Sequence, residues 1–184
     1  TGLDTPGSPG AIDQPDPDAV ADGGAMTADP TATVEHTLDG ERSRVEEMME
    51  RDGINHAEIR SDLQDAMTQN VNVFREKEGI QDALETIRDC RERYQNVAVA
   101  DPSRTFNTIE TRNLIDVAET IALGALAREE FRGAHWRAEH QARDDEDWLK
   151  HTMIAWNDGE PDLYYTDVLL DGEEKTYEPK IRSY

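Results

Sequence analysis

The sequence has little cysteine, little lysine and no long hydrophobic run, and each shortage excludes a kind of structure. Cys90 is the only cysteine among 184 residues, so intramolecular disulfides and thiolate metal clusters are excluded. The longest apolar run, residues 121–127, is much shorter than the roughly 20 residues that a membrane-spanning helix needs. No stretch resembles a signal peptide. We therefore expect a soluble protein in a reduced, cytoplasmic compartment, peripheral to a membrane at most.

Motifs that hold nucleotides or activate a serine nucleophile are also missing from the sequence. It contains no Gly-x-Gly-x-x-Gly after a β-prone run, no phosphate-cradling loop and no Gly-x-Ser-x-Gly elbow. No known motif in this chain could therefore hold a dinucleotide.

Acidic residues dominate what is present. Asp and Glu total 41 against 19 Lys and Arg, which gives a formal net charge of −22, and only four of the basic residues are lysines. A field of this sign repels nucleic acid and anionic lipid, so no nucleic-acid partner is expected. The charge could reflect disorder or the solvated surface of a protein from a halophile. Because it is spread over segments that keep regular apolar stripes, we favour the halophilic surface.

The first 38 residues differ in composition from the rest. Residues 1–38 are rich in Gly, Pro, Asp, Ala and Thr and show no usable periodicity, which predicts a flexible linker or a surface insertion. The chain starts with Thr1 instead of Met, and we expect a fragment or a processed product. Its length allows one domain with a real core.

Residues 39–140 have the spacing of amphipathic helices and are expected to form a three- to four-helix bundle. A first helix begins near Glu41, and Asn55 predicts the capped start of a second. A further cap at Asn107 opens the most apolar helix, which we expect to be central in the bundle and to end near Gly133. Gly124 would let a neighbouring backbone approach this helix closely. Its buried face is predicted to carry Leu114, Val117, Ala118, Ile121 and Ala125.

Residues 141–184 change from helical to extended character and are expected to form a loop, a β-hairpin and a C-terminal tail. Residues 150–156 and 163–170 are β-prone runs, separated by the turn signal of residues 157–161. The sequence thus predicts a mainly α fold, in which the helical bundle is followed by the hairpin and an extended tail.

The densest group of polar side chains follows the most apolar helix, a common place for functional loops. One interpretation is a metal site of His135, His140 and His151 with a carboxylate, but the histidines lack the i, i+4 spacing of a helical zinc motif. Another is an acid–base pair of His135 with Glu139 or Asp144. We favour a network of arginine–carboxylate and histidine hydrogen bonds that pins the loop to a neighbouring surface. The candidate residues are Arg132, His135, Arg137, Arg143, Asp144 and Asp145.

Several segments, which follow one another along the chain in the same order as in the family, resemble the flavoprotein subunits of succinate dehydrogenases and fumarate reductases. Residues 128–137 are similar to that family's Arg-x-Glu-Ser-Arg-Gly-Ala-His-x-Arg signature, and residues 143–152 resemble its Arg-Asp-Asp-x-x-Trp-x-x-His-Thr segment. Residues 63–71 are similar to its Leu-x-x-x-Met-x-x-x-Val helix, and residues 180–184 look like its C-terminal end. Phe131 departs from the pattern, because the family usually has Ser there, and the first 38 residues lie outside it.

The resemblance implies a division of labour between this chain and a part of the polypeptide upstream of it. In this family a covalently attached FAD accepts hydride from succinate, and electrons leave through an iron–sulfur subunit toward quinone. The flavin-linking His, the proton-transferring Arg and the dicarboxylate-binding residues lie upstream of the matched segment. The resemblance therefore implies no catalytic, cofactor-binding or metal-binding residue within residues 1–184, and FAD held by the part that precedes them.

Partners and location follow from the same resemblance. We expect contacts with the chain's own flavin-binding domain and the iron–sulfur subunit, and indirect contact with membrane anchor subunits at the cytoplasmic face of the membrane. The six candidate residues would lie at the interface with the flavin domain, where Arg132 and Arg137 offer rigid bidentate donors. An isolated piece of this kind would be inactive and prone to aggregate through an exposed apolar face.

Other functions compete with this interpretation. Within the family, the C-terminal end favours succinate dehydrogenase over fumarate reductase, and L-aspartate oxidase shares only the Glu-Ser-Arg-Gly part of the signature. Outside the family, the chain could be a stand-alone acidic helical module that binds a protein partner, or a metal-dependent hydrolase that uses the histidines. The stand-alone module would bind no flavin, and the hydrolase would bind a stoichiometric amount of metal.

Overall fold

A computed structural model describes residues 30–157 and 159–171. The chain divides into two compact units, Thr1–Met48 and Met49–Tyr184. Within the described residues, no helix is both long and apolar enough to cross a membrane.

Helix α1 (Pro30–Glu50) begins earlier than the sequence suggested. Residues 30–38, part of the segment expected to be a flexible linker or a surface insertion, are helical, whereas we expected the first helix to begin near Glu41. Pro30 stands at the first helical position, where its fixed φ suits the helix and its missing N–H costs nothing. On the surface of α1 the guanidinium of Arg44 pairs with Glu41 one turn earlier, at 2.6 Å. The remainder of the expected linker, residues 1–29, lies outside the described residues.

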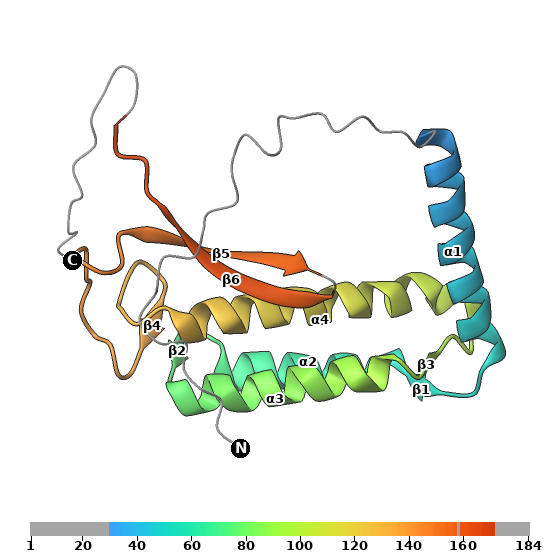
Figure 1. Cartoon of the computed structure of the whole chain (residues 1–184). Helices are drawn as coiled ribbons and strands as arrows, with labels where there is room; N and C mark the ends of the chain where they lie inside the picture. Colours follow the sequence, from blue (N-terminus) through green and yellow to red (C-terminus); the bar gives the residue numbers. More distant parts are fainter. Residues whose placement is uncertain (1–29, 158, 172–184) are drawn as a thin grey trace. The chain divides into compact units, whose positions relative to one another are not determined.

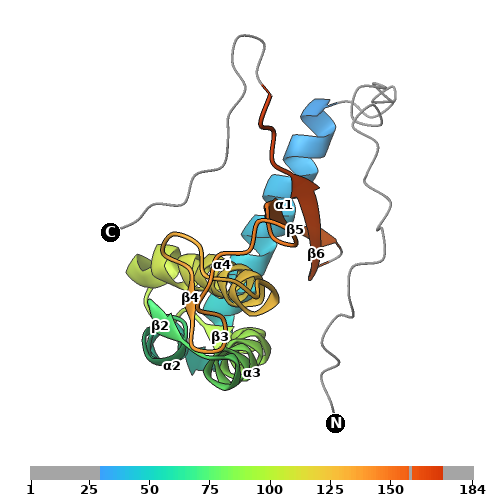
Figure 2. The ribbon, with the colours of Figure 1, turned by 90° about the vertical axis from the view of Figure 1, so that its left-hand side faces the viewer.

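Helices α2 (His56–Asn70), α3 (Lys77–Tyr94) and α4 (Thr105–Ala127) pack against one another. Figure 2 shows them nearly end-on as a triangle. Each contributes one aliphatic stripe to a shared core. Ile59, Ile80, Leu84, Ile87 and Ile115 are at most 1% exposed, and burying each such side chain stabilises the fold by about 1.5–3 kcal/mol. The predicted helical bundle is confirmed.

Two short parallel pairings join the ends of the bundle. Strand β1 (Ile54–Asn55) pairs with β3 (Val97–Ala98), and β2 (Phe74–Arg75) pairs with β4 (Trp136–Arg137). The expected cap is present at α2, where Asn55 Oδ1 accepts a hydrogen bond from the Ala57 amide at 2.9 Å. The β2–β4 pairing matters for function because it fastens the loop after α4 to the segment that leads into α3.

The ends of α4 differ from the prediction. The chain turns first through the 3-10 helix η2 (Pro102–Arg104), which Asp101 caps by accepting from the Ser103 amide at 2.9 Å. Asn107 therefore lies inside α4 and is not its cap. At the other end α4 stops at Ala127, well before Gly133.

The buried face of α4 is only partly the predicted one, because Ala118 and Ala125 are buried as predicted but other residues of that face are not. Ile115, Ala118 and Ala122 pack inward, whereas Val117 and Ile121 are 54% and 47% exposed. A side chain added at position 124 would meet nothing within 4 Å, so the close approach expected at that glycine is absent from the described residues. One face of α4 packs on α2 and α3 and another faces the hairpin, so the helix lies between the other two helices and the hairpin.

The predicted hairpin follows the bundle, with its second strand shifted. Strands β5 (Lys150–Asn157) and β6 (Glu160–Asp167) are antiparallel, and Asn157 pairs with Glu160. This leaves a two-residue turn with Gly159 at a φ of 86°, a conformation that suits glycine. The hairpin lies across α4 (Figure 1), where the indole N–H of Trp156 donates to the Thr120 hydroxyl at 3.2 Å. The expected extended tail lies beyond residue 171, outside the described residues.

Candidate functional site

The loop after α4 is organised around one buried carboxylate, Glu130. Its side chain is 0% exposed. Its Oε1 accepts from Arg128 Nε at 2.8 Å and from Arg132 Nε at 2.6 Å. Its Oε2 accepts from Arg132 Nη2 at 3.0 Å and from the Asp144 amide at 3.1 Å. We call these contacts the Glu130 network.

The electrostatics of Glu130 follow from these contacts. Burial by itself raises the pKa of the carboxyl, but the hydrogen bonds from Arg132, the Asp144 amide and Arg128 outweigh it and lower the pKa. Sequence reasoning missed Glu130 as a candidate. The only signal for it was its place in the Arg-x-Glu motif of residues 128–137.

A second carboxylate, Asp145, joins two of the predicted arginines. Its Oδ1 accepts from Arg132 Nη2 at 2.6 Å and from Arg143 Nε at 2.7 Å, and its Oδ2 accepts from Arg143 Nη2 at 2.6 Å. The hydrogen bonds from Arg143 and Arg132 lower the pKa of Asp145 to about 2. The neighbouring Asp144 caps a turn, because its Oδ1 accepts from the Glu146 amide at 2.9 Å. The structure thus brings four of the six predicted residues together.

Arg137, the fifth candidate, is buried beneath the end of α4. The residue is 1% exposed, and its Nη1 donates to the carbonyls of Leu126 at 2.8 Å and Arg128 at 3.4 Å. A cation at this place satisfies carbonyls that the last helical turn leaves unpaired and complements the negative end of the helix dipole. The guanidinium of Arg137 is therefore used within the chain.

His135, the sixth candidate, is held by a hydrogen bond to the backbone. Its Nε2 lies 2.9 Å from the Arg128 carbonyl, so this nitrogen carries the proton and donates it. Burial lowers the pKa of His135, and the nearby cations Arg75, Arg128 and Arg137 lower it further against the effect of this hydrogen bond. A tight turn with Gly133 at a φ of 60° places the ring, through paired Arg132 and His135 backbone hydrogen bonds.

Neither the acid–base pair nor the metal site finds support in these contacts. Glu139, one of the two proposed partners of His135, accepts from the Lys77 amide at 2.6 Å and from Arg137 Nε at 3.3 Å. Asp144 is held in the turn described above. Over residues 30–157 and 159–171, no three His, Cys, Asp or Glu side chains are grouped so that they could hold a metal ion.

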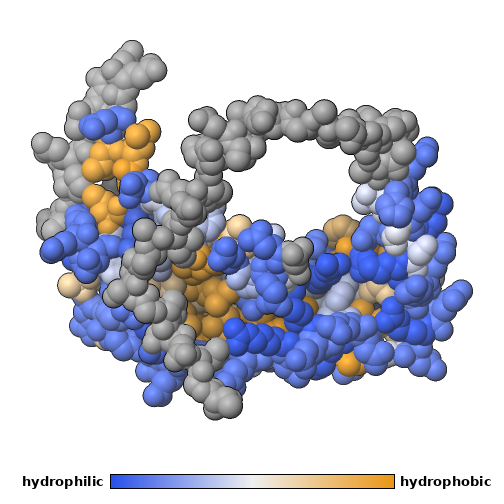
Figure 3. Space-filling model, in the orientation of Figure 1, coloured by the Kyte–Doolittle hydropathy of each residue, from blue (hydrophilic) through white to orange (hydrophobic). Residues whose placement is uncertain are grey.

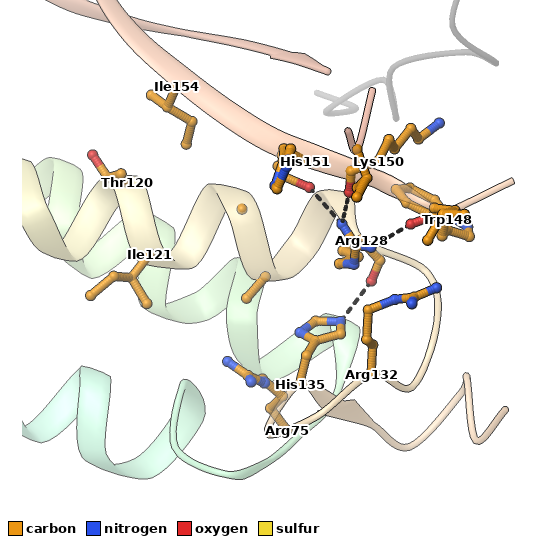
Figure 4. A pocket seen from close by; sticks show the side chains of 15 residues that line it. Arg75, Thr120, Ile121, Arg128, Arg132, His135, Trp148, Lys150, His151 and Ile154 are labelled. Atoms are coloured by element: carbon orange, nitrogen blue, oxygen red, sulfur yellow. Dashed lines mark hydrogen bonds between the residues drawn. The ribbon is translucent and has the colours of Figure 1, made fainter. Parts of the chain in front are cut away.

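A cavity of about 550 Å³ opens between α4, the loop and the start of β5. In Figure 4, Arg128 lies in the middle, Arg75 and His135 approach from one side, and His151 of the hairpin lies on the other. The guanidinium of Arg128 ties the two sides together. It donates to the carbonyls of Trp148 at 2.5 Å and Lys150 at 3.0 Å. These hydrogen bonds connect the loop after α4 to the start of the hairpin at the edge of the cavity.

Fold and contacts define a helical domain whose arginines and carboxylates fix a loop and shape one cavity beside it. A family model described as the fumarate reductase flavoprotein C-terminus matches residues 60–184. The chain therefore belongs to the C-terminal domain family of the succinate dehydrogenase and fumarate reductase flavoproteins. The resemblance that the loop motifs suggested is confirmed.

Relatives of both kinds match this chain. The fumarate reductase flavoprotein subunit of Haemophilus influenzae is 36% identical over 120 residues, which are 62% of this chain and 20% of the relative. The succinate dehydrogenase flavoprotein subunit of Coxiella burnetii is 39% identical over 110 residues, which are 57% and 19%. The chain thus spans about a fifth of the length of these curated relatives.

Solved structures agree with the sequence relatives. A quinol fumarate reductase chain of E. coli superposes with a TM-score of 0.73 at 30% identity, over 86% of this chain and 28% of that one. Adenylylsulfate reductase of Archaeoglobus fulgidus, with a TM-score of 0.60 at 17% identity, shares the fold alone.

Proposed function

We propose that this chain is the C-terminal domain of a succinate dehydrogenase flavoprotein subunit and that it supports the part of the subunit that binds the flavin. The observation that carries the proposal is the Glu130 network. In this network, hydrogen bonds among the side chains of Arg128, Glu130 and Arg132 hold the loop in one shape. A fixed loop is what a domain needs in order to present a surface to a partner, because ordering is then already complete before contact.

We keep the predicted interface in this proposal and divide its residues according to their contacts within the chain. Arg132, His135, Arg137, Arg143, Asp144 and Asp145 remain our candidates for the region that meets the flavin-binding part. Arg137 caps α4, and Arg132 binds Glu130 and Asp145. We therefore propose that these two arginines hold the loop in shape and that the other candidate residues form the surface that contacts the flavin-binding part. Exposed apolar residues on α4, Val117 and Ile121, are further surface for this partner to cover.

The cofactor belongs elsewhere in this proposal. No glycine-rich phosphate-cradling loop occurs in the sequence, and the residues around the described cavity do not form one. FAD would be bound by the part of the subunit that precedes this domain. There it accepts hydride from succinate, and electrons pass to an iron–sulfur subunit and on to quinone, at the cytoplasmic face of a membrane to which anchor subunits hold the complex. Relatives named as subunits of such enzymes support this.

Succinate oxidation, as opposed to fumarate reduction, is the finer part of the proposal. Curated relatives carry both names, and the similarity of residues 180–184 to the end of the family is our reason to prefer the dehydrogenase. Rates measured in both directions with quinone and quinol would decide between them. A halophilic origin, suggested by the charge of −22, stays a prediction that activity in molar salt would test.

The proposal is tested on the native polypeptide that contains these peptides, purified from membranes of its source. We expect an intact mass several times that of this chain and a flavin absorbance that remains with the denatured protein. A flavin-free polypeptide of 184 residues would contradict the proposal and leave the stand-alone interaction module.

A further inference from the structure

The cavity beside the Glu130 network has a charge opposite to that of the chain. Acidic residues outnumber basic ones by 41 to 19 in the sequence. Among the described residues that line the cavity, however, none is Asp or Glu, whereas Arg75, Arg128, Arg132 and Lys150 are all present, with His135 and His151. A concave site lined by one sign of charge concentrates the opposite sign. This surface is therefore suited to a carboxylate.

Two of these cations have no carboxylate partner among the described residues. Arg75 donates to the carbonyls of Trp136 at 3.2 Å and Ala134 at 3.3 Å, which are neutral. Burial, and then the positive charge of Arg137, lower the pKa of Arg75, which is the signature of a cation without a counterion. The ammonium of Lys150 lies 4.7 Å from the centre of the Trp148 ring. Arg128 and Arg132, by contrast, are already paired with Glu130.

The rest of the cavity is apolar and open. Ile121 is 47% exposed and lines the cavity together with Ala125 and Ile154. At Gly124, also in the lining, an added Cβ would meet nothing within 4 Å. Figure 3 shows hydrophobic side chains gathered on this face of the molecule, below the hairpin. A small dianion would make no favourable contact with these apolar residues. A peptide with an apolar side chain next to a carboxylate would contact both the apolar residues and the cations.

We propose that this cavity receives an acidic segment from the flavin-binding part of the same polypeptide, with an apolar side chain against Ile121 and a carboxylate on Arg75. This inference rests on the proposed function. The chain spans about a fifth of the length of its curated relatives, and under the proposed function the remainder of the subunit contains the flavin-binding part that would supply this segment. The interaction would dock the two parts by charge complementarity, which fixes register and orientation.

The segment can be identified in the full-length flavoprotein by photo-crosslinking. A benzophenone amino acid replaces Ile121, the purified protein is irradiated, and the linked peptides are identified by mass spectrometry. We expect one dominant cross-link, to a peptide upstream of this chain with Asp or Glu close to the linked residue. Cross-links only within residues 1–184, only to another subunit, or to an upstream peptide without acidic residues would each overturn the proposal, as would no cross-link at all.

A charge swap then tests the carboxylate contact. Arg75→Glu is expected to lower the cross-link yield by roughly tenfold or more, and Arg75→Gln, which keeps amide donors for the two carbonyls, by less. Changing the captured Asp or Glu to Arg should restore the yield in the Arg75→Glu protein. The matched control is Arg42→Glu on α1, whose side chain is 73% exposed and which makes the same change in net charge. Equal losses for both, or failure of the swap to restore the yield, would overturn the proposal.

Failure of this inference is distinguishable from failure of the proposed function. The intact mass and the flavin absorbance of the full-length protein report on the function, whatever the cross-links show. A long, flavin-containing subunit with no cross-link from position 121 would contradict the proposed docking site and leave the proposed function intact.

Discussion

Replacing Glu130 by Gln is the sharpest test of how the loop is held. The substitution keeps size and shape but removes the charge and turns one oxygen into an amide donor. At Oε2 that donor would face Arg132 Nη2 and the Asp144 amide, which are donors themselves. If the amide is flipped, it faces the donors Arg128 Nε and Arg132 Nε at the Oε1 position. Either orientation leaves buried groups unsatisfied.

The magnitude follows from the burial of the pair. Glu130 is fully buried, and removing one partner of a buried ion pair costs about 3–5 kcal/mol. Because each 1.4 kcal/mol is about a factor of ten, the loop should open about 10²- to 4 × 10³-fold more often. The hydrogen bonds are too strongly coupled for their separate values to be summed.

Hydrogen–deuterium exchange in the intact protein measures this opening. The reporter is the Phe131 amide, which donates to the Ala142 carbonyl at 2.9 Å and is not among the donors to the Glu130 carboxylate. The reference is the Ile54 amide, bonded to Asn96 at the far end of the bundle, whose exchange should not change. Glu129→Gln is the matched control, since Glu129 is exposed. Equal exchange at Phe131 in the two variants would refute the role given to Glu130.

Four further predictions concern Asp145, two glycines and Cys90. The pKa of Asp145 is lowered to about 2, so the stability that it contributes is complete above its unfolded pKa of about 4 and is lost as the pH falls toward 2. Asp145→Asn should flatten that part of the unfolding curve, and an unchanged pH profile would contradict the ion pairs. Gly53→Ala should destabilise the protein by about 1–3 kcal/mol, because a Cβ there lies 2.3 Å from the Asn96 carbonyl. Gly40→Ala on α1, where a Cβ meets nothing, should instead stabilise by about 0.5–1 kcal/mol in thermal melts. Burial raises the pKa of Cys90 to about 11, so maleimide at pH 8 should label it only after unfolding, and rapid labelling of the native protein would show that its helix is not packed as described.

The periodic elements could be predicted from the sequence because each is decided by neighbours in the chain. Helices α2 and α3 have narrow apolar stripes, so only one face of each is buried, with Ile59 and Leu63 of α2 and Ile80, Leu84 and Ile87 of α3 in the core. Phe74 continues the apolar spacing of α2 in the sequence but lies beyond the end of that helix and is exposed. The hairpin was signalled by a turn sequence between two β-prone runs. The predicted limits of its second strand were wrong by a few residues. Strand β6 begins at Glu160, directly after Gly159, and includes Pro161. Proline is tolerated there because it lies near the start of an edge strand.

Helix α4 shows where such reasoning stops. It is the most apolar helix, and apolar residues occur on several of its faces, so periodicity does not say which face packs inward. The structure buries Ile115, Ala118 and Ala122 and leaves Val117 and Ile121 at the surface. Small alanines suit close helix packing, while the larger residues on the other side remain for another surface to cover. That choice depends on the shapes of α2 and α3, which no local pattern contains.

The sequence by itself determined which residues could belong to the polar loop and which family the chain resembles, because both depend on residue identity in a fixed order. Only the tertiary structure decided what each loop residue does. Glu130, which appeared as one acidic residue among 41, became the centre of the network, and Arg137, predicted at an interface, became the buried cap of α4. The physical reason is that a charge acquires its role from its burial and from partners that are distant in the sequence. Arg75 and the loop carbonyls it binds are separated by about 60 residues and meet only when β2 pairs with β4.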